Sequence, residues 1–136
     1  MNIEDINFRG RTMDGKWIYG KLVHYPEIAN MVGIDNLYGY TVVDPNTVGQ
    51  YTGLKDRYEG EIYDGDILES RASANEEDWK RWKVLFEDGG YCFERIEEKT
   101  KRKKRSIPER NLLCKDEIEL YGLVIVGNIH DNEGLT

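Results

Sequence analysis

The stretch from Gln50 to Leu68 constrains the fold of this chain more than any other part of its sequence. Two apolar and aromatic runs enclose a polar connection that contains Gly53 and Gly60, and Asp64-Gly65-Asp66 then leads into a further extended run. Glycine is required where the backbone φ angle is positive or where two backbones approach closely. We therefore expect defined turns between β-strands in this stretch rather than a loose loop.

The composition favours a turn-rich, mainly β or α+β fold of antiparallel strands. The 136 residues include 14 glycines and only 3 prolines, and 39% of them are hydrophobic, which is enough to bury a core. We expect an N-terminal strand-rich lobe over residues 1–60 and a C-terminal lobe over residues 61–136. One continuous domain is the alternative, because no low-complexity linker separates the two parts.

Residue alternation and turn signals predict the individual elements. Residues 27–36 lack clean periodicity and are expected to form a loop, whereas residues 121–129 are the most apolar run and are expected to form a central, fully buried strand. A helical turn with Asn75 as its N-cap is expected at 75–79. Strands are expected over 16–25, 37–43, 48–52 and 67–70, and the clearest hairpin over 81–96.

The strand expected over 16–25 has apolar groups on both of its faces. Trp17, Tyr19 and Val23 fall on one face, and Ile18 and Leu22 fall on the other. We therefore expect this strand to be covered, at least in part, on both sides.

The charge, the cysteine content and the absence of targeting signals indicate the compartment and the class of partner to expect. The net charge of −7 and the pI near 4.9 argue against a general affinity for nucleic acid. Neither a secretory signal nor an apolar run of the roughly 20 residues that a membrane span needs is found. Cys92 and Cys114 do not make a disulfide framework, and a bridge between the two is the alternative to free thiols. We therefore expect a cytoplasmic protein with two free thiols and no membrane partner.

One segment departs from the acidic balance, because residues 99–105 hold six of the 19 basic residues. Such a segment can neutralise several phosphates, and Trp82, Tyr91 and Phe93 in the nearby hairpin can stack on unpaired bases if they are exposed. The alternative is a solvated segment whose cations balance acids such as Glu94. The candidate nucleic-acid contacts are Lys99, Lys101, Arg102, Lys103, Lys104 and Arg105.

No pattern in the sequence predicts a catalytic, cofactor or metal site. A calcium loop needs oxygen ligands at its first, third and fifth positions, and counting from Asp56, Tyr58 and Gly60 break that pattern. His24 and His130 do not lie at ligand spacing from each other or from a cysteine. We predict a protein that is not an enzyme and keep a metal-dependent hydrolase as a distant alternative. The carboxylates considered as ligands are Asp56, Glu59, Glu61, Asp64 and Asp66.

The central stretch resembles the signature of the YopX family of bacteriophage and prophage proteins. The resemblance rests on Gln50-Tyr-Thr-Gly-Leu-Lys-Asp and on Glu61-Ile-Tyr-Asp-Gly-Asp-Ile, with one departure where Arg57-Tyr-Glu-Gly replaces a turn that usually contains Asn-Gly. It implies a strand-rich, phage-encoded protein and brings no catalytic residue with it. Further matches are Phe8-Arg-Gly, Trp17-Ile-Tyr-Gly, Val48-Gly-Gln, Phe86-Glu-Asp-Gly and Val126-Gly-Asn-Ile-His.

A second likeness concerns the fold of the C-terminal half, which is similar in its strand order to small SH3-like barrels. The segments that carry it are 65–68, 83–91 and 124–129. Barrels of this kind occur in nucleic-acid-associated and in peptide-binding proteins, so the likeness does not decide the function.

These features predict a non-catalytic accessory protein of a phage or prophage, which acts in the cytoplasm of the bacterial host cell. We expect it to work as a homo-oligomer or by binding a phage or host protein. The alternative is a nucleic-acid-binding accessory protein that uses residues 99–105.

Overall fold

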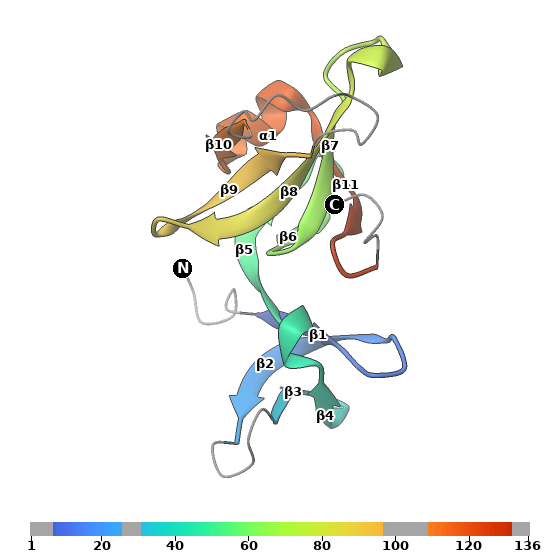
Figure 1. Ribbon diagram of the computed structural model, residues 1–136, viewed down its shortest axis with the longest axis vertical. Helices are drawn as coiled ribbons and strands as arrows, with labels where there is room; N and C mark the ends of the chain where they lie inside the picture. Colours follow the sequence, from blue (N-terminus) through green and yellow to red (C-terminus); the bar gives the residue numbers. More distant parts are fainter. Residues whose placement is uncertain (1–6, 26–30, 97–108, 132–136) are drawn as a thin grey trace. The chain divides into compact units, whose positions relative to one another are not determined.

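The computed structural model describes residues 7–25, 31–96 and 109–131, and these residues form an antiparallel β protein with one short α-helix (Figure 1). The strands belong to a six-stranded and a five-stranded sheet. The chain divides into two compact units, residues 1–53 and 54–136. The mainly β, antiparallel fold expected from the sequence is confirmed, and the division falls after Gly53, upstream of the boundary expected at residue 60.

The six-stranded sheet has the order β4-β3-β2-β1-β5-β6. Asp44 N donates a hydrogen bond to Arg11 O at 2.8 Å, so the chain leaving β4 returns to the end of β1. Ile34 and Val43 are fully buried on one side of this sheet. The strands are β1 (Phe8–Arg11), β2 (Trp17–His24), β3 (Val32–Asn36), β4 (Gly39–Val43), β5 (Gly49–Lys55) and β6 (Glu61–Tyr63), with the 3-10 helix η2 (Pro45–Thr47) between β4 and β5.

Strand β3 occupies a segment that the sequence predicts to be a loop, and that prediction is wrong. Strand prediction depends on alternating apolar and polar side chains, and Gly33 interrupts that alternation because it has no side chain. It is required by packing: a Cβ atom at Gly33 would lie 2.2 Å from Cζ of Tyr40 on the neighbouring strand. The Tyr40 ring therefore lies directly over the backbone of Gly33, and a larger residue there would displace the ring.

The five-stranded sheet has the order β10-β9-β8-β7-β11, and every pairing in it is antiparallel. The hairpin expected over 81–96 is confirmed as β8 and β9, with Val84 opposite Phe93. Because the described strands follow one another without closing on themselves, the SH3-like barrel is not confirmed. The strands are β7 (Asp66–Ser70), β8 (Lys80–Glu87), β9 (Gly90–Arg95), β10 (Arg110–Leu112) and β11 (Leu123–Asn128).

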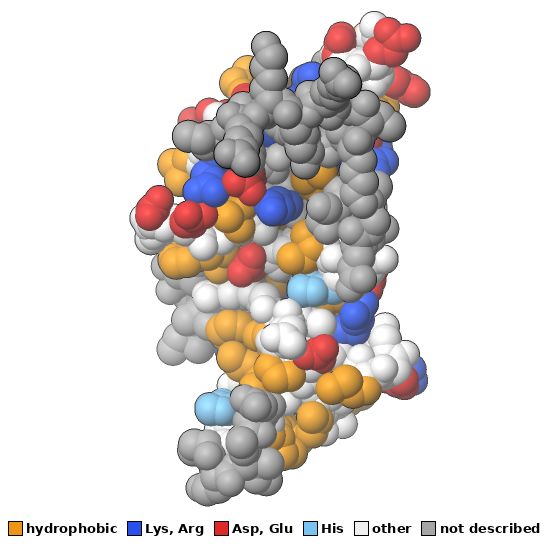
Figure 2. Space-filling model, viewed as in Figure 1, with side chains coloured by type: hydrophobic (Ala, Val, Ile, Leu, Met, Phe, Trp, Pro, Cys, Tyr) orange, Lys and Arg blue, Asp and Glu red, His pale blue; other side chains and the backbone are white. Residues whose placement is uncertain are grey.

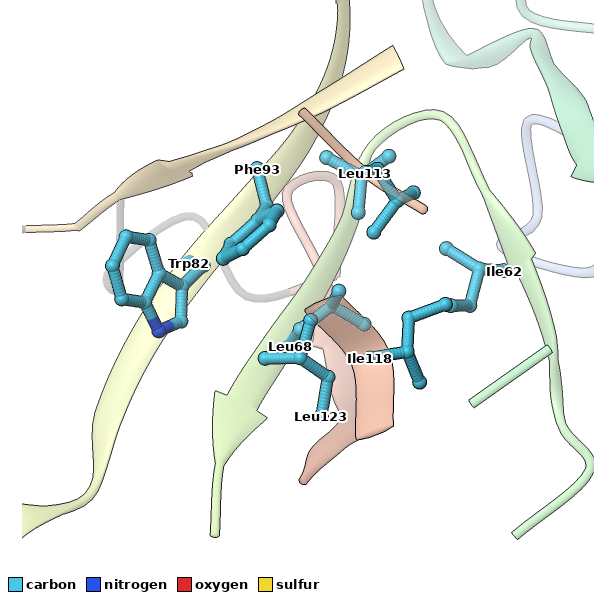
Figure 3. Close-up of a cluster of buried hydrophobic side chains, with 8 residues drawn as sticks. Ile62, Leu68, Trp82, Phe93, Leu113, Ile118 and Leu123 are labelled. Atoms are coloured by element: carbon cyan, nitrogen blue, oxygen red, sulfur yellow. The ribbon is translucent and has the colours of Figure 1, made fainter. Parts of the chain in front are cut away.

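One apolar cluster forms the core of the second unit (Figure 3). Trp82 and Phe93 meet edge to face, with ring centroids 5.0 Å apart. Helix α1 (Lys115–Tyr121), which the sequence analysis missed, adds Ile118 to this cluster and ends at Gly122 in the left-handed conformation. Burial of each large side chain contributes about 1.5–3 kcal/mol. The cluster consists of Ile62, Leu68, Trp82, Val84, Phe93, Leu113, Ile118 and Leu123.

Two further elements test the sequence predictions. Asn75 caps the 3-10 helix η3 (Glu76–Asp78), and its Oδ1 accepts a hydrogen bond from Glu77 N at 3.1 Å, as expected. The run over 121–129 was expected to be a central strand, but among the described strands β11 lies at the end of its sheet and pairs only with β7. Within β11 only Leu123 and Val124 are fully buried, so the prediction of a central, fully buried strand is wrong.

The backbone groups on the outer edge of β11 form hydrogen bonds with the turn that follows β5. Arg57 N donates to Leu123 O at 3.1 Å, and the Asp56 carboxylate accepts from Ile125 N at 2.9 Å. The second oxygen of that carboxylate accepts from Tyr58 N at 2.9 Å and from Gly60 N at 2.8 Å. Asp56 is buried. Its side chain therefore provides buried acceptors both for the N–H groups of its own turn and for an N–H group at the edge of the sheet.

We predict that Asp56→Ala destabilises the second unit by roughly 3 kcal/mol, because it leaves three N–H groups without their acceptor, each at about 1–3 kcal/mol when buried. Asp56→Asn keeps one oxygen for the turn and should lose less. Glu61→Ala, at an exposed position of β6, is the control and should change stability by less than about 0.5 kcal/mol. Urea unfolding measures all three variants, and equal losses for Asp56→Ala and Glu61→Ala would contradict this role of Asp56.

Candidate protein-binding surface

The six candidate nucleic-acid contacts, residues 99–105, lie outside the described residues. Their flanks are described: Arg95 N donates to Glu109 O at 2.7 Å, and β9 and β10 are paired. The basic segment therefore belongs to the connection between two neighbouring strands. Stacking on bases required exposed rings, and Trp82 and Phe93 do not meet that condition because they are buried in the core, whereas Tyr91 is half-buried.

Two of the carboxylates in the central stretch are buried and accept backbone hydrogen bonds within the fold. Asp56 accepts three backbone hydrogen bonds, and Asp66 is buried and accepts one from Tyr63 N at 2.7 Å. Glu59 pairs with Lys55 at 4.0 Å on the surface. Among the described residues, no group of three or more His, Cys, Asp or Glu side chains is arranged to hold a metal ion.

Both cysteines are free thiols, and Cys92 is a packed one. Its side chain is buried, and Sγ lies 3.6 Å from Leu85 O. Burial raises the pKa of the Cys92 thiol above its usual value, which disfavours the reactive thiolate. Of the helices that the structure describes, none is both long enough and apolar enough to cross a lipid bilayer.

The surface of the first unit carries large apolar side chains that the fold leaves uncovered. Tyr19 and Tyr25 belong to β2 and its continuation, and Tyr40 and Val42 to β4. All four are exposed, and the strand register places them on the same face of the sheet. Tyr25 and Tyr40 meet edge to face with ring centroids 5.5 Å apart. Figure 2 shows hydrophobic side chains at the surface of this unit.

The turn between β3 and β4 carries the two most exposed of these side chains. Leu37 is 101% exposed and Tyr38 is 99% exposed. The turn is held in place by Asn36, whose Oδ1 accepts from Tyr38 N at 2.8 Å and whose Nδ2 donates to Tyr19 O at 2.9 Å. We call the surface formed by Tyr19, Tyr25, Tyr40 and Val42, with Leu37 and Tyr38 at its turn, the aromatic face.

Charged side chains lie on the same side of the sheet as the aromatic face, and Arg9 of β1 is directly opposite Tyr19. Lys21 of β2 lies directly opposite Asp35 of β3, on the same side of the sheet as Tyr19 and Tyr40. Isolated exposed apolar residues are common, whereas a group of this size around a fixed turn is typical of an interaction site. The arrangement is therefore suited to contact with another apolar protein surface.

The sequence pattern indicates the apolar residues of β2 in this surface, but it does not indicate the exposed turn that contains Leu37 and Tyr38. The apolar residues on both faces of 16–25 were expected to be covered, yet Tyr19 remains exposed within the chain. Leu37 and Tyr38 were assigned to the strand 37–43, because both residue types are common in strands, but they form the turn before β4.

The comparisons with known proteins agree with this fold. The family model described as YopX protein matches residues 7–135. Among solved structures, the crystal structure of protein EF1440 from Enterococcus faecalis is similar, with a TM-score of 0.61 and 18% sequence identity over 96% of each chain. At this identity the likeness shows a shared fold. Among the curated proteins compared, none matches this chain.

Proposed function

Given that this chain belongs to the YopX family, we propose that it is a non-catalytic accessory protein of a phage or prophage that acts by self-assembly through the aromatic face. Its place of action in this proposal is the cytoplasm of the bacterial host. The observation that carries the proposal is the pair Leu37 and Tyr38, which are fully exposed on a turn that hydrogen bonds hold in one conformation.

Two free-energy terms favour binding through the aromatic face: burial of apolar side chains and a small loss of conformational entropy. Burial of Leu37 and Tyr38 would contribute about 1.5–3 kcal/mol each. The Asn36 hydrogen bonds fix the turn before any partner arrives, so less conformational entropy is lost on association. Tyrosine is also among the residues that most often dominate binding energy at protein interfaces.

A second copy of the chain is the partner that the charges favour. The whole chain carries a net charge of −7, so two copies repel each other over most of their surface. The aromatic face does not share this negative excess, because Asp35 is opposed by Lys21 and Arg9 lies opposite Tyr19 on the same side of the sheet. A phage or host protein with an apolar surface is the other partner that this face could accept.

We predict that the wild-type protein is an oligomer at micromolar concentration and that the double variant Leu37→Ser, Tyr38→Ser shifts it to the monomer. Loss of the two side chains should raise the dissociation constant by about 100-fold. Met13→Ser is the matched control, because Met13 is 83% exposed outside the aromatic face and in the same unit. Light scattering after size-exclusion chromatography measures the mass of each protein.

Two outcomes of this experiment would contradict the proposal. A wild type that is strictly monomeric would remove self-assembly, and an unchanged mass of the double variant would remove the aromatic face as the contact. Circular dichroism of both variants shows that the sheets remain folded.

Nucleic-acid binding is the alternative function, and its support is the concentration of six cations in the connection between β9 and β10. Because Trp82 and Phe93 are buried, such binding would rest on phosphate contacts rather than on base stacking.

For this alternative we predict binding of single- or double-stranded DNA at low salt that weakens steeply as salt is added, because cations on the phosphates are released. Gel shifts compare the wild type with a variant in which the six cations of 99–105 are changed to Ser. A variant with Lys16, Lys21 and Lys55 changed to Ser is the control. Absence of a shift, or equal shifts for all three proteins, would end the nucleic-acid alternative.

A further inference from the structure

We propose that the outer edge of β10 accepts an extended segment of a partner protein, in which an apolar side chain is flanked by basic residues. This site lies in the second unit and goes beyond the proposed self-assembly, because it uses no residue of the aromatic face. Three observations carry it: the direction of the β10 backbone groups, a notch beside the strand, and the charge around that notch.

Among the strands that the structure describes, β10 is the last of its sheet and pairs only with β9. Arg95 N donates to Glu109 O at 2.7 Å and Leu113 N donates to Tyr91 O at 2.9 Å, so the backbone groups of residues 109 and 113 point toward β9. Backbone direction alternates along an antiparallel strand. The N–H and C=O groups of Arg110 and Leu112 therefore point to the outer edge, where they can pair with an added strand.

A notch of about 270 Å³ lies beside this edge. Its lining includes Tyr91 and Cys92 of β9 and Leu112 of β10. Leu112 is 66% exposed, and the Tyr91 ring packs edge to face on Phe86, which is 56% exposed, with centroids 5.0 Å apart. The notch is smaller than the roughly 300–1,000 Å³ of small-molecule sites. It is of a size for one apolar side chain.

A sheet edge and a neighbouring notch are the two parts that strand addition requires. Main-chain hydrogen bonds to the edge supply affinity, and a pocket for alternate side chains supplies specificity. In an added strand, the side chain opposite Leu112 lies on the same face of the sheet as Leu112 and Cys92. That position directs the side chain toward the notch.

The charges at the notch favour a basic segment. Arg110 is held by Glu87 and Glu94, each at 2.8 Å, and Lys83 lies 3.3 Å from Glu94. The hydrogen bond from Arg110 lowers the pKa of Glu94, so this carboxylate stays ionised. These two cations face the three acids Glu87, Glu94 and Asp88, and Asp88 is exposed at the tip of the β8–β9 turn. Counted over the described side chains at the notch, this leaves an excess of one negative charge, which complements a lysine or arginine in the partner.

The test uses a labelled peptide, acetyl-Lys-Thr-Leu-Thr-Lys-amide, titrated with the full chain and followed by fluorescence anisotropy. Alternation places its leucine and both lysines on one face of an extended strand. Two control peptides carry either an N-methyl group on the leucine amide, which removes a main-chain donor, or glutamate in place of both lysines. We expect both controls to bind more weakly than the parent peptide by about tenfold.

Protein variants locate the contact. Leu112→Asp should weaken binding of the parent peptide by about tenfold, because it places a charge at the notch. Leu120→Asp is the matched control: Leu120 is 67% exposed on α1 of the same unit, and its variant should bind as the wild type does. The Leu37→Ser, Tyr38→Ser variant should also bind the peptide normally, which separates this site from the proposed self-assembly.

Several outcomes would overturn the proposal. These are no binding of the parent peptide at millimolar concentration, equal binding of the N-methylated peptide, or equal losses for Leu112→Asp and Leu120→Asp. If no peptide binds and Leu112→Asp lowers the mass of the protein in light scattering, the edge pairs with a second copy and the proposal fails.

Discussion

The buried carboxylate of Asp56 is the interaction on which the second unit depends. It accepts hydrogen bonds from Tyr58 and Gly60 in its own turn and from Ile125 in β11, which lies far along the chain. Without it, the outer edge of β11 would lose an acceptor at a position where no further strand pairs. Strand β11 in turn places Leu123 in the core, beside Ile62 and Leu68. One side chain thus connects a local turn to the packing of the sheet.

The hydrogen bonds of Asp56 indicate that the central stretch, Gln50 to Leu68, serves to hold the fold together. Gly60 lies close against this carboxylate, because a Cβ atom there would be 3.1 Å from Asp56 Oδ1 and would crowd it. Asp66 plays a similar part by accepting the hydrogen bond of Tyr63 N. A carboxylate whose oxygens already accept backbone N–H groups has little capacity left for an ion or a substrate. Any function of the protein is therefore sought at the surfaces that the fold leaves open.

Those surfaces differ in kind between the two units. In the first unit, the side chains on one face of β2, β3 and β4 stay exposed, and binding there would rest on burial of apolar area. In the second unit, β10 offers backbone groups beside a small notch, and binding there would rest on strand pairing with a selected side chain. Both are suited to protein partners, which agrees with an accessory role.

The sequence predicts the parts of this fold that local signals determine. The hairpin of β8 and β9 follows from alternation around Asp88-Gly89-Gly90, and the Asn75 cap follows from its side-chain chemistry. Strand β3 could not be predicted, because Gly33 is small for the sake of the Tyr40 ring on another strand. Strand β11 lies at the end of its sheet and bonds to Asp56, which is 69 residues away in the sequence, and a local sequence pattern does not show so distant a contact. The exposure of Tyr19 was hidden for the same reason, since alternation shows which residues share a face but not what covers it.

The most direct test of the central role of Asp56 is amide hydrogen exchange at Tyr58, Gly60 and Ile125. In the wild type, these three N–H groups should be protected. In Asp56→Asn, under conditions where the amide of Val84 in the core strand stays protected, Ile125 should lose its protection most, because the new amide group faces it with a donor. Unchanged protection of Ile125 in that variant would contradict the role assigned to the carboxylate.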